Sequence, residues 1–259
     1  MSNKETLSKS QKPKNKRMVK IVGIVSGIVA VIVVAGVIFI YTYTYTVSGK
    51  VTDISTGQAV KDVKVAVAGH TQTTDDQGEY KISDIKIFEK PPMIITPPSQ
   101  FMKHDNIKLD YKYLKTNNDF TVEPTLIEIV GKTNTAGING QYDYLWDLMH
   151  PDDRTNWGSK TEYKDLLSKR DVIYSNNSYT VKSIDISQNI RQLTTWKSPI
   201  TGKEYNDVME VPLKYTMVDN GKEQPDNTLK YFKKVNGFYH YFTTVDKSEL
   251  IKWLDQYSK

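Results

Sequence analysis

The sequence predicts a chain in three structured parts: a membrane-spanning helix, an all-β unit and an α+β unit. Residues 21–40 contain no charged side chain, and Ser26 is the only polar residue among them. Residues 63–67 alternate apolar and polar side chains, which is the pattern of a half-buried strand. From Tyr142 onward the apolar residues first take helical spacing and later return to strand spacing. The expected segments are a tail over 1–18, a transmembrane helix over 19–41, an all-β unit over 46–124 and an α+β unit over 125–259.

The apolar stretch has the length of a transmembrane helix. About 20 residues at 1.5 Å rise match a hydrocarbon core of about 30 Å. A cleaved signal peptide is the alternative, but its apolar core is shorter and a small-x-small cleavage site follows it. Here the apolar run continues to Ile40 and is followed by alternating Tyr and Thr. We therefore expect the helix to be retained as an anchor in the lipid bilayer.

The distribution of charge predicts the orientation of the chain. Residues 1–20 hold seven Lys or Arg and only Glu5, a net charge of +6, so the rest of the chain carries −1 of the total +5. Basic residues beside a first span favour the cytoplasmic side. We expect a single-pass protein of the cell membrane with a cytoplasmic N-terminus and extracytoplasmic C-terminal units. The part of the chain after the span is nearly neutral, so it lacks the basic surface that nucleic-acid binding needs.

Two further features of the sequence bear on partners. Gly23 and Gly27 form a small-xxx-small pattern, which lets two helices approach closely and so allows a homodimer through the span.

The chain has no cysteine, which excludes disulfides and thiolate metal sites. The four histidines lack metal-ligand spacing, so the sequence predicts no metal and no cofactor.

The all-β unit resembles a known module. The run VSGKVTDISTGQAVKDVKVAVAG, followed by TTDDQGEYKI, is similar to the carboxypeptidase regulatory-like domain, a transthyretin-like (prealbumin-like) β-sandwich. The resemblance implies a non-catalytic module that serves as a stalk, a folding aid or a binding surface. The acidic residues 75–79 lack the alternating ligands of a calcium loop, so we expect a turn in which an Asp accepts local backbone N–H groups and Gly takes a positive φ.

The C-terminal unit begins with helices and continues with strands. Tyr142, Leu145, Trp146 and Met149 form one apolar helix face. Residues 159–162 form a capping box that starts a second helix. The expected strands are 179–186, 192–197, 211–217, 229–235 and 238–242, with Asn-Gly at 236–237 as a type I′ hairpin signal. A last helix follows Asp246.

This second unit also resembles a known family. The segment GQYDYLWDLMHPDDRTNWGSKTEYKDLL is similar to the extracytoplasmic NTF2-like domains of bacterial membrane-anchored proteins. The resemblance implies an α+β cone, in which helices pack on a curved antiparallel sheet around a pocket. Such domains include enzymes, binding domains and spacers, so the fold does not decide the function.

His150 and Asp153 are the best candidates for catalysis. A histidine with a carboxylate partner can transfer protons, which would suit an NTF2-like isomerase or hydrolase. The alternative is an ordinary helix end, with His150 on the negative end of the helix dipole and Asp153 capping the next turn or paired with Arg154. We expect the structural role.

The preferred hypothesis is a non-enzymatic scaffold and binding protein of the bacterial cell envelope. In it, the β-sandwich is a stalk and the NTF2-like unit binds an envelope protein, a peptide or a glycan. Aromatic side chains supply most contact energy at binding surfaces. The candidate binding residues are therefore Tyr142, Trp146, Trp157, Tyr239 and Tyr241.

Overall fold

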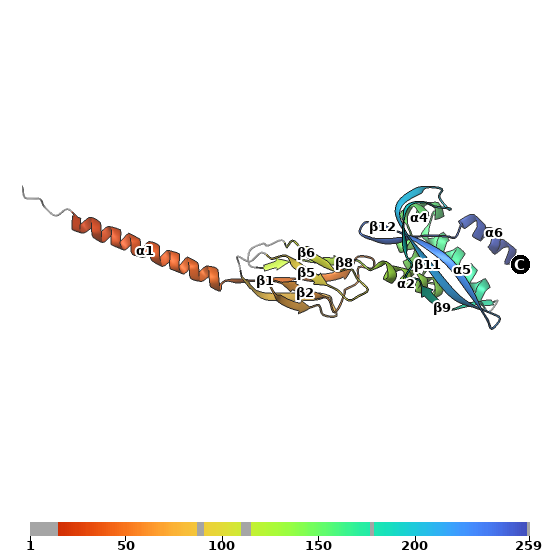
Figure 1. Cartoon of the computed structure of the whole chain (residues 1–259), viewed down its shortest axis with the longest axis horizontal. Helices are drawn as coiled ribbons and strands as arrows, with labels where there is room; N and C mark the ends of the chain where they lie inside the picture. The colour runs from red at the N-terminus through yellow and green to blue at the C-terminus, as the bar shows by residue number, and fades with distance from the viewer. Residues whose placement is uncertain (1–14, 87–90, 110–114, 177–178, 258–259) are drawn as a thin grey trace, which may run out of the picture.

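The computed structural model describes residues 15–86, 91–109, 115–176 and 179–257. Figure 1 shows three parts in a row: an N-terminal helix, a β-rich unit, and a C-terminal unit that contains the remaining helices. Most of the regular structure downstream of the first helix is β-sheet.

Helix α1 spans Asn15–Thr42 and leads directly into the first strand. Its described apolar side chains, such as Ile24 and Val31, are exposed. Among the residues that the structure describes, no helix combines the length and the apolar character needed to cross a membrane. Gly27 lies on an open part of the helix surface, and the side-chain surroundings of Gly23 are outside the described residues.

The β-rich unit consists of two four-stranded sheets. In the first sheet, β1 pairs antiparallel with β4 and parallel with β7 and β8. The second sheet has the order β3-β2-β5-β6 and is antiparallel. One core, to which Val47 and Val65 belong, takes buried side chains from both sheets, which confirms the expected β-sandwich. The strands are β1 Thr44–Asp53, β2 Lys64–Val67, β3 His70–Thr73, β4 Glu79–Lys86, β5 Met93–Thr96, β6 His104–Ile107, β7 Lys115–Asn117 and β8 Phe120–Val122.

The acidic segment before β4 is a turn, as its composition predicts. Asp75 Oδ1 accepts the backbone N–H groups of Gln77 (3.0 Å) and Glu79 (2.8 Å). Gly78 has φ +75°, and a Cβ there would lie 2.5 Å from the Val51 carbonyl oxygen. Glycine therefore satisfies both the left-handed backbone and the close approach to β1.

Five helices belong to the C-terminal unit: α2 Leu126–Ile138, α3 Tyr142–Leu148, α4 Pro151–Trp157, α5 Lys160–Asn176 and α6 Lys247–Tyr257. Thr125 caps α2 by accepting the N–H of Glu128 (3.3 Å). Ser159 caps α5 by accepting the N–H of Glu162 (3.1 Å), as the capping box predicts. The α2 and α4 helices were absent from the sequence prediction.

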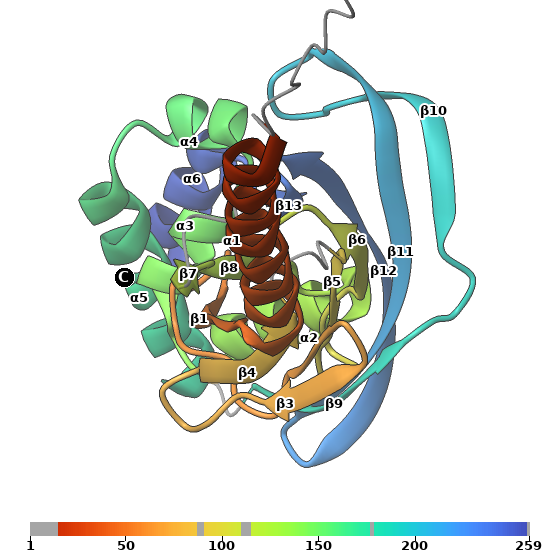
Figure 2. The ribbon, with the colours of Figure 1, turned by 90° about the vertical axis from the view of Figure 1, so that its left-hand side faces the viewer.

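A five-stranded antiparallel sheet completes this unit: β9 Thr180–Ile186, β10 Arg191–Lys197, β11 Glu204–Asp219, β12 Lys222–Val235 and β13 Phe238–Phe242. Strand β11 pairs with β12 over residues 209–219, with β10 over residues 204–210 and with β9 over residues 213–218. Figure 2 shows the long strands curving around one side of the unit, with α3 to α6 on the other side. The buried core lies between helices and sheet.

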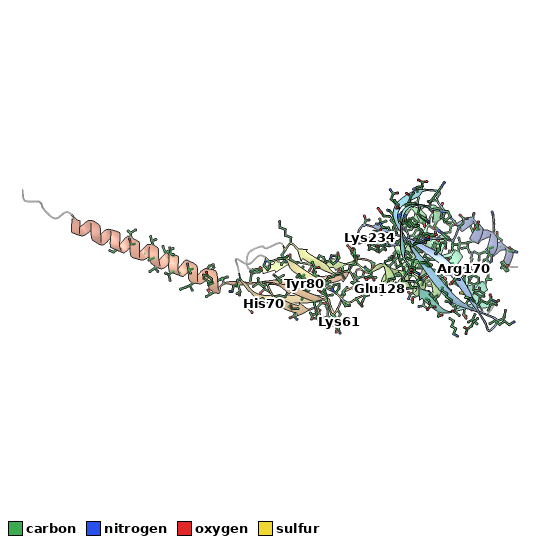
Figure 3. The ribbon with its side chains drawn as sticks, in the orientation of Figure 1. Lys61, His70, Tyr80, Glu128, Arg170 and Lys234 are labelled. Atoms are coloured by element: carbon green, nitrogen blue, oxygen red, sulfur yellow. The ribbon has the colours of Figure 1, made fainter. Side chains whose placement is uncertain are left out.

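Ion pairs join the sandwich to the C-terminal unit. Lys132 on α2 lies 3.4 Å from the Asp53 carboxylate at the end of β1. Lys234 on β12 lies 2.8 Å from Glu123, just after β8. Figure 3 shows Lys234 and Glu128 near this junction and Arg170 deeper in the C-terminal unit.

Candidate functional site

A large cavity lies in the C-terminal unit, between α2, α5 and the sheet. Its volume is about 710 Å³. Residues of α2, α5, β11, β12 and β13 line it, together with the segment that follows β13. Both the helices and the curved sheet therefore contribute side chains, so the cavity depends on the packing of the whole unit.

A polar cluster occupies one part of this cavity around Asn134. The Asn134 Oδ1 atom accepts hydrogen bonds from the Tyr215 hydroxyl (2.6 Å) and from Lys230 Nζ (2.6 Å). The Asn134 Nδ2 atom donates to the Val130 carbonyl oxygen (2.8 Å), which fixes which end of the amide is the acceptor. Burial, together with repulsion from Arg170, lowers the pKa of Lys230 to about 8.

Arg170 on α5 supplies a second cation to the cavity. Its Nε and Nη2 atoms donate to one oxygen of Asp171, at 3.0 Å and 2.8 Å. Its guanidinium also lies 5.7 Å from the centre of the Tyr174 ring. Arg170 therefore has a carboxylate partner. Lys230 forms no ion pair with any described residue.

Aromatic side chains line another part of the cavity. The Tyr163 and Tyr241 hydroxyls lie 3.1 Å apart and share one hydrogen bond. The Trp157 ring packs edge-on against Tyr163, with 4.9 Å between ring centres. Trp157 is fully buried, and its indole N–H has no hydrogen-bond partner in the described part of the chain. Burial raises the pKa of the Tyr241 hydroxyl well above its usual value, so this group stays protonated.

The structure brings only part of the predicted aromatic binding face together. Trp157 and Tyr241 line the large cavity, whereas Tyr142 lines a shallower hollow next to it. Trp146 packs against Tyr163 at 5.6 Å between ring centres, and Tyr239 lies 5.8 Å from the ammonium of a neighbouring lysine. Neither Trp146 nor Tyr239 is among the described residues that line these two spaces. The five aromatics do not form one surface.

His150 does not line the cavity, and its position relative to the helices differs from the prediction. It is the N-cap of α4, so it lies at the positive end of a helix dipole instead of the negative end of the preceding helix. Its Nδ1 atom accepts the N–H of Asp152 (3.3 Å), and its ring stacks on Phe242 at 4.3 Å. Burial lowers the pKa of His150 to about 4, which keeps the imidazole neutral as the cap requires.

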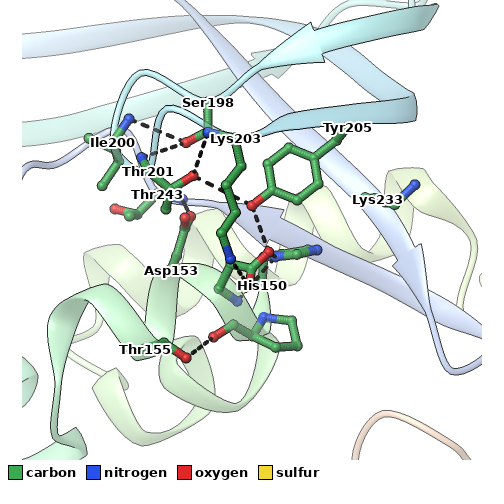
Figure 4. A network of polar contacts seen from close by, with 12 residues as sticks. His150, Asp153, Thr155, Ser198, Ile200, Thr201, Lys203, Tyr205, Lys233 and Thr243 are labelled. Carbon is green, nitrogen blue, oxygen red and sulfur yellow. Dashed lines mark hydrogen bonds and ion pairs between the residues drawn. The ribbon is translucent and has the colours of Figure 1, made fainter.

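Asp153 is fully buried and holds the segment after β13. Its Oδ2 atom accepts the backbone N–H of Thr243 (2.7 Å), and burial raises its pKa to about 6. Within the described residues, no hydrogen bond or ion pair connects His150 with Asp153. Figure 4 shows His150 beside Lys203 and Tyr205, both of which contact Asp152, and Asp153 next to Thr243. The contacts of Asp152 tie α4 to the β10–β11 loop.

Sequence reasoning missed the polar residues of the cavity. Lys230 precedes Phe232 by two positions on β12, so a strand register anchored on buried Phe232 would have placed Lys230 on the core face. Asn134 was missed because α2 was missed, although the Thr125-to-Glu128 spacing matches a capping box. Arg170 carries no comparable local signal, since α5 is rich in exposed charged residues.

Comparison with known proteins gives little support for a specific function. No protein-family model and no curated protein matches the sequence. Among solved structures, the major pilin subunit of Bacillus cereus has 15% identity over 32% of this chain and 31% of its own, with a TM-score of 0.22. A DUF3823 family protein from Bacteroides ovatus has 9% identity over 76% of this chain and 94% of its own, also with a TM-score of 0.22. The chain spans about a third of the pilin subunit, and neither likeness carries a functional argument.

Proposed function

We propose that the chain is a membrane-anchored, extracytoplasmic binding protein of the bacterial cell envelope, in which the β-sandwich is a stalk and the C-terminal unit binds a ligand. The cavity of about 710 Å³ carries this proposal. Ligand sites in proteins commonly have volumes of about 300–1,000 Å³ and combine an apolar lining with a few placed polar groups. This cavity has aromatic rings and a lysine for which the described residues supply no counter-ion.

The arrangement of elements supports assignment of the C-terminal unit to the NTF2-like cones. Helices precede a curved antiparallel sheet, and the cavity lies between the two. For the sandwich, the two-sheet architecture supports a transthyretin-like stalk. The cavity lies between the helices and the sheet and has a limited volume. It therefore suits a small molecule or the terminal group of an envelope peptide or glycan better than a whole protein surface.

Membrane anchoring is proposed from the sequence. The uncharged run over residues 21–40 and the basic residues before it support an anchor with its N-terminus in the cytoplasm. Because α1 is followed at once by β1, such an anchor would hold the sandwich close to the membrane.

Binding accounts for the observed contacts better than catalysis by His150 and Asp153. A general base needs a lone pair directed at substrate and a pKa near the working pH. The His150 lone pair at Nδ1 is used by the N–H of Asp152, and its ring is covered by Phe242. Asp153 accepts a backbone N–H in the protein interior. These contacts explain both residues as parts of the framework.

A pair of glycine variants tests the proposal. Gly137 lines the cavity, and a Cβ there would meet only Leu145 at 3.9 Å; Gly131, on the same helix, does not line it and has open space around its Cβ. Gly137→Phe should fill the cavity, whereas Gly131→Phe adds the same ring outside it. The probe is 4-(trifluoromethyl)benzamide, followed by ¹⁹F NMR with the full-length chain in lipid nanodiscs and empty nanodiscs as the blank.

Line broadening of the probe should occur with wild type and Gly131→Phe and disappear with Gly137→Phe. Circular dichroism melting of both variants checks that each is folded. Equal broadening with the two variants would refute a ligand-binding cavity, as would the absence of broadening with wild type for both this amide and the matching acid, 4-(trifluoromethyl)benzoate.

A further inference from the structure

We infer that the cavity recognises a ligand that carries a carboxylate, which pairs with Lys230 while an apolar or ring-shaped body packs against the aromatic part of the lining. This inference rests on the proposed binding function and names the chemical class of its ligand. Three features of the lining support it: an unbalanced positive charge, donors with unused hydrogens, and a lysine held in place by fixed neighbours.

The described side chains that line the cavity carry an unbalanced positive charge. Lys230 and Arg170 are cations, and Asp171 is the carboxylate among the described lining residues. Asp171 is used by two N–H groups of Arg170. Within the described part of the chain, the partner of Lys230 is the neutral Asn134 oxygen. A partly buried charge without a counter-ion is unfavourable, and an anion from a ligand would remove that cost.

Donors of the cavity also remain without an acceptor among the described residues. The Lys230 ammonium has three N–H groups, and one hydrogen bond, to Asn134, is found among the described residues. The Tyr163–Tyr241 pair contains two hydroxyl hydrogens but shares a single hydrogen bond, so one hydrogen remains available. A complementary ligand must therefore present acceptors, and a carboxylate offers about four acceptor sites on two oxygens.

Fixed neighbours hold the lysine in position. Asn134 is buried, and its amide is oriented by the Val130 carbonyl, so its oxygen is a rigid acceptor for both Tyr215 and Lys230. A charged donor whose position is set before binding loses little conformational entropy when the ligand arrives. The lysine is therefore arranged as a recognition group, whereas a lysine that merely covers apolar surface would extend its ammonium into water.

The test compares an acid with its neutral amide. The probes are 4-(trifluoromethyl)benzoate and 4-(trifluoromethyl)benzamide, titrated by ¹⁹F NMR into the full-length chain in zwitterionic lipid nanodiscs at pH 7. The variants are Lys230→Met, with Lys230→Gln as a second neutral replacement, and Lys233→Met as the matched control. Lys233 lies on the same strand, its side chain contacts the Asn206 carbonyl oxygen, and it does not line the cavity.

Wild type should bind the benzoate at least tenfold more tightly than the benzamide. Lys230→Met and Lys230→Gln should weaken benzoate binding at least tenfold and change benzamide binding less than twofold, and Lys233→Met should change neither. If the benzamide binds but the benzoate binds no more tightly, or if benzoate binding survives both Lys230 variants, the carboxylate assignment is wrong and the binding cavity stands. If neither probe binds wild type, both proposals are wrong.

Discussion

The titration of His150 gives a sharp test of the structural role assigned to it. Its pKa is about 4 in the folded protein, because burial disfavours the charged ring, and 6.5 is the ordinary value. A depressed histidine pKa means that the unfolded chain binds more protons between these two values. The contribution of His150 to the free energy of unfolding is therefore fully present above pH 6.5 and is lost as the pH falls towards 4. From these two pKa values, the loss between pH 7 and pH 5 is about 2 kcal/mol.

The matched perturbation is His150→Asn. Asparagine is a good N-cap, and its side-chain oxygen can accept the N–H of Asp152 without a group that titrates in this range. All four tryptophans lie in the C-terminal unit, so their fluorescence during urea unfolding reports on this unit within the full-length chain. The free energy of unfolding of wild type, relative to His150→Asn, should fall by about 2 kcal/mol from pH 7 to pH 5.

The control is His70→Asn, which replaces an exposed histidine on β3 of the sandwich, outside the unit whose unfolding the tryptophans report. Equal pH slopes for wild type and His150→Asn would refute the reasoning. They would mean that His150 is accessible to water and able to take a proton, as a catalytic base requires.

Four further predictions follow from other positions. Asp153→Asn should show the opposite pH effect: because burial raises the pKa of Asp153 to about 6, wild type should gain about 1 kcal/mol relative to the variant from pH 7 to pH 5 in the same urea assay. Gly49→Ala should destabilise the sandwich by about 2–3 kcal/mol in calorimetry, since its Cβ would lie 2.0 Å from the Asn118 carbonyl oxygen, and an unchanged melting temperature would contradict that contact. Gly131→Ala should stabilise the C-terminal unit by about 0.5–1 kcal/mol, because nothing lies within 4 Å of the added methyl group and alanine favours a helix; a loss of stability would show that the site is crowded. Gly27→Leu should reduce crosslinked dimer in membranes if α1 pairs through its glycine face, and equal dimer yields would exclude that homodimer.

Local signals in the sequence predicted many of the elements. The turn at Asn236 has positive φ at both central residues and joins β12 to β13, as an Asn-Gly hairpin should. The capping residue Ser159 and the strand containing Val211 are also where the sequence places them. Each of these features depends on neighbouring residues alone, so a local pattern suffices to predict it.

The candidate site could not be predicted in the same way, because its residues come from separate elements. Asn134, Arg170 and Lys230 lie on α2, α5 and β12, and only the packing of the helices on the sheet brings them to one cavity. Aromatic residues were a poor guide, since Trp146 packs against the Tyr163 ring and Tyr239 lies beside a lysine, and neither lines the cavity. His150 was misplaced because Pro151 both follows one helix and starts the next.

The central claim is that the C-terminal cavity holds a ligand, and the most direct measurement is to identify what it holds in the cell. Full-length wild type, Gly137→Phe and Gly131→Phe would each be purified from native membranes, and the small molecules released on denaturation would be compared by mass spectrometry. The account predicts an acidic compound that accompanies wild type and Gly131→Phe in near-stoichiometric amount and is absent from Gly137→Phe. The same compounds in the same amounts from all three proteins would contradict it.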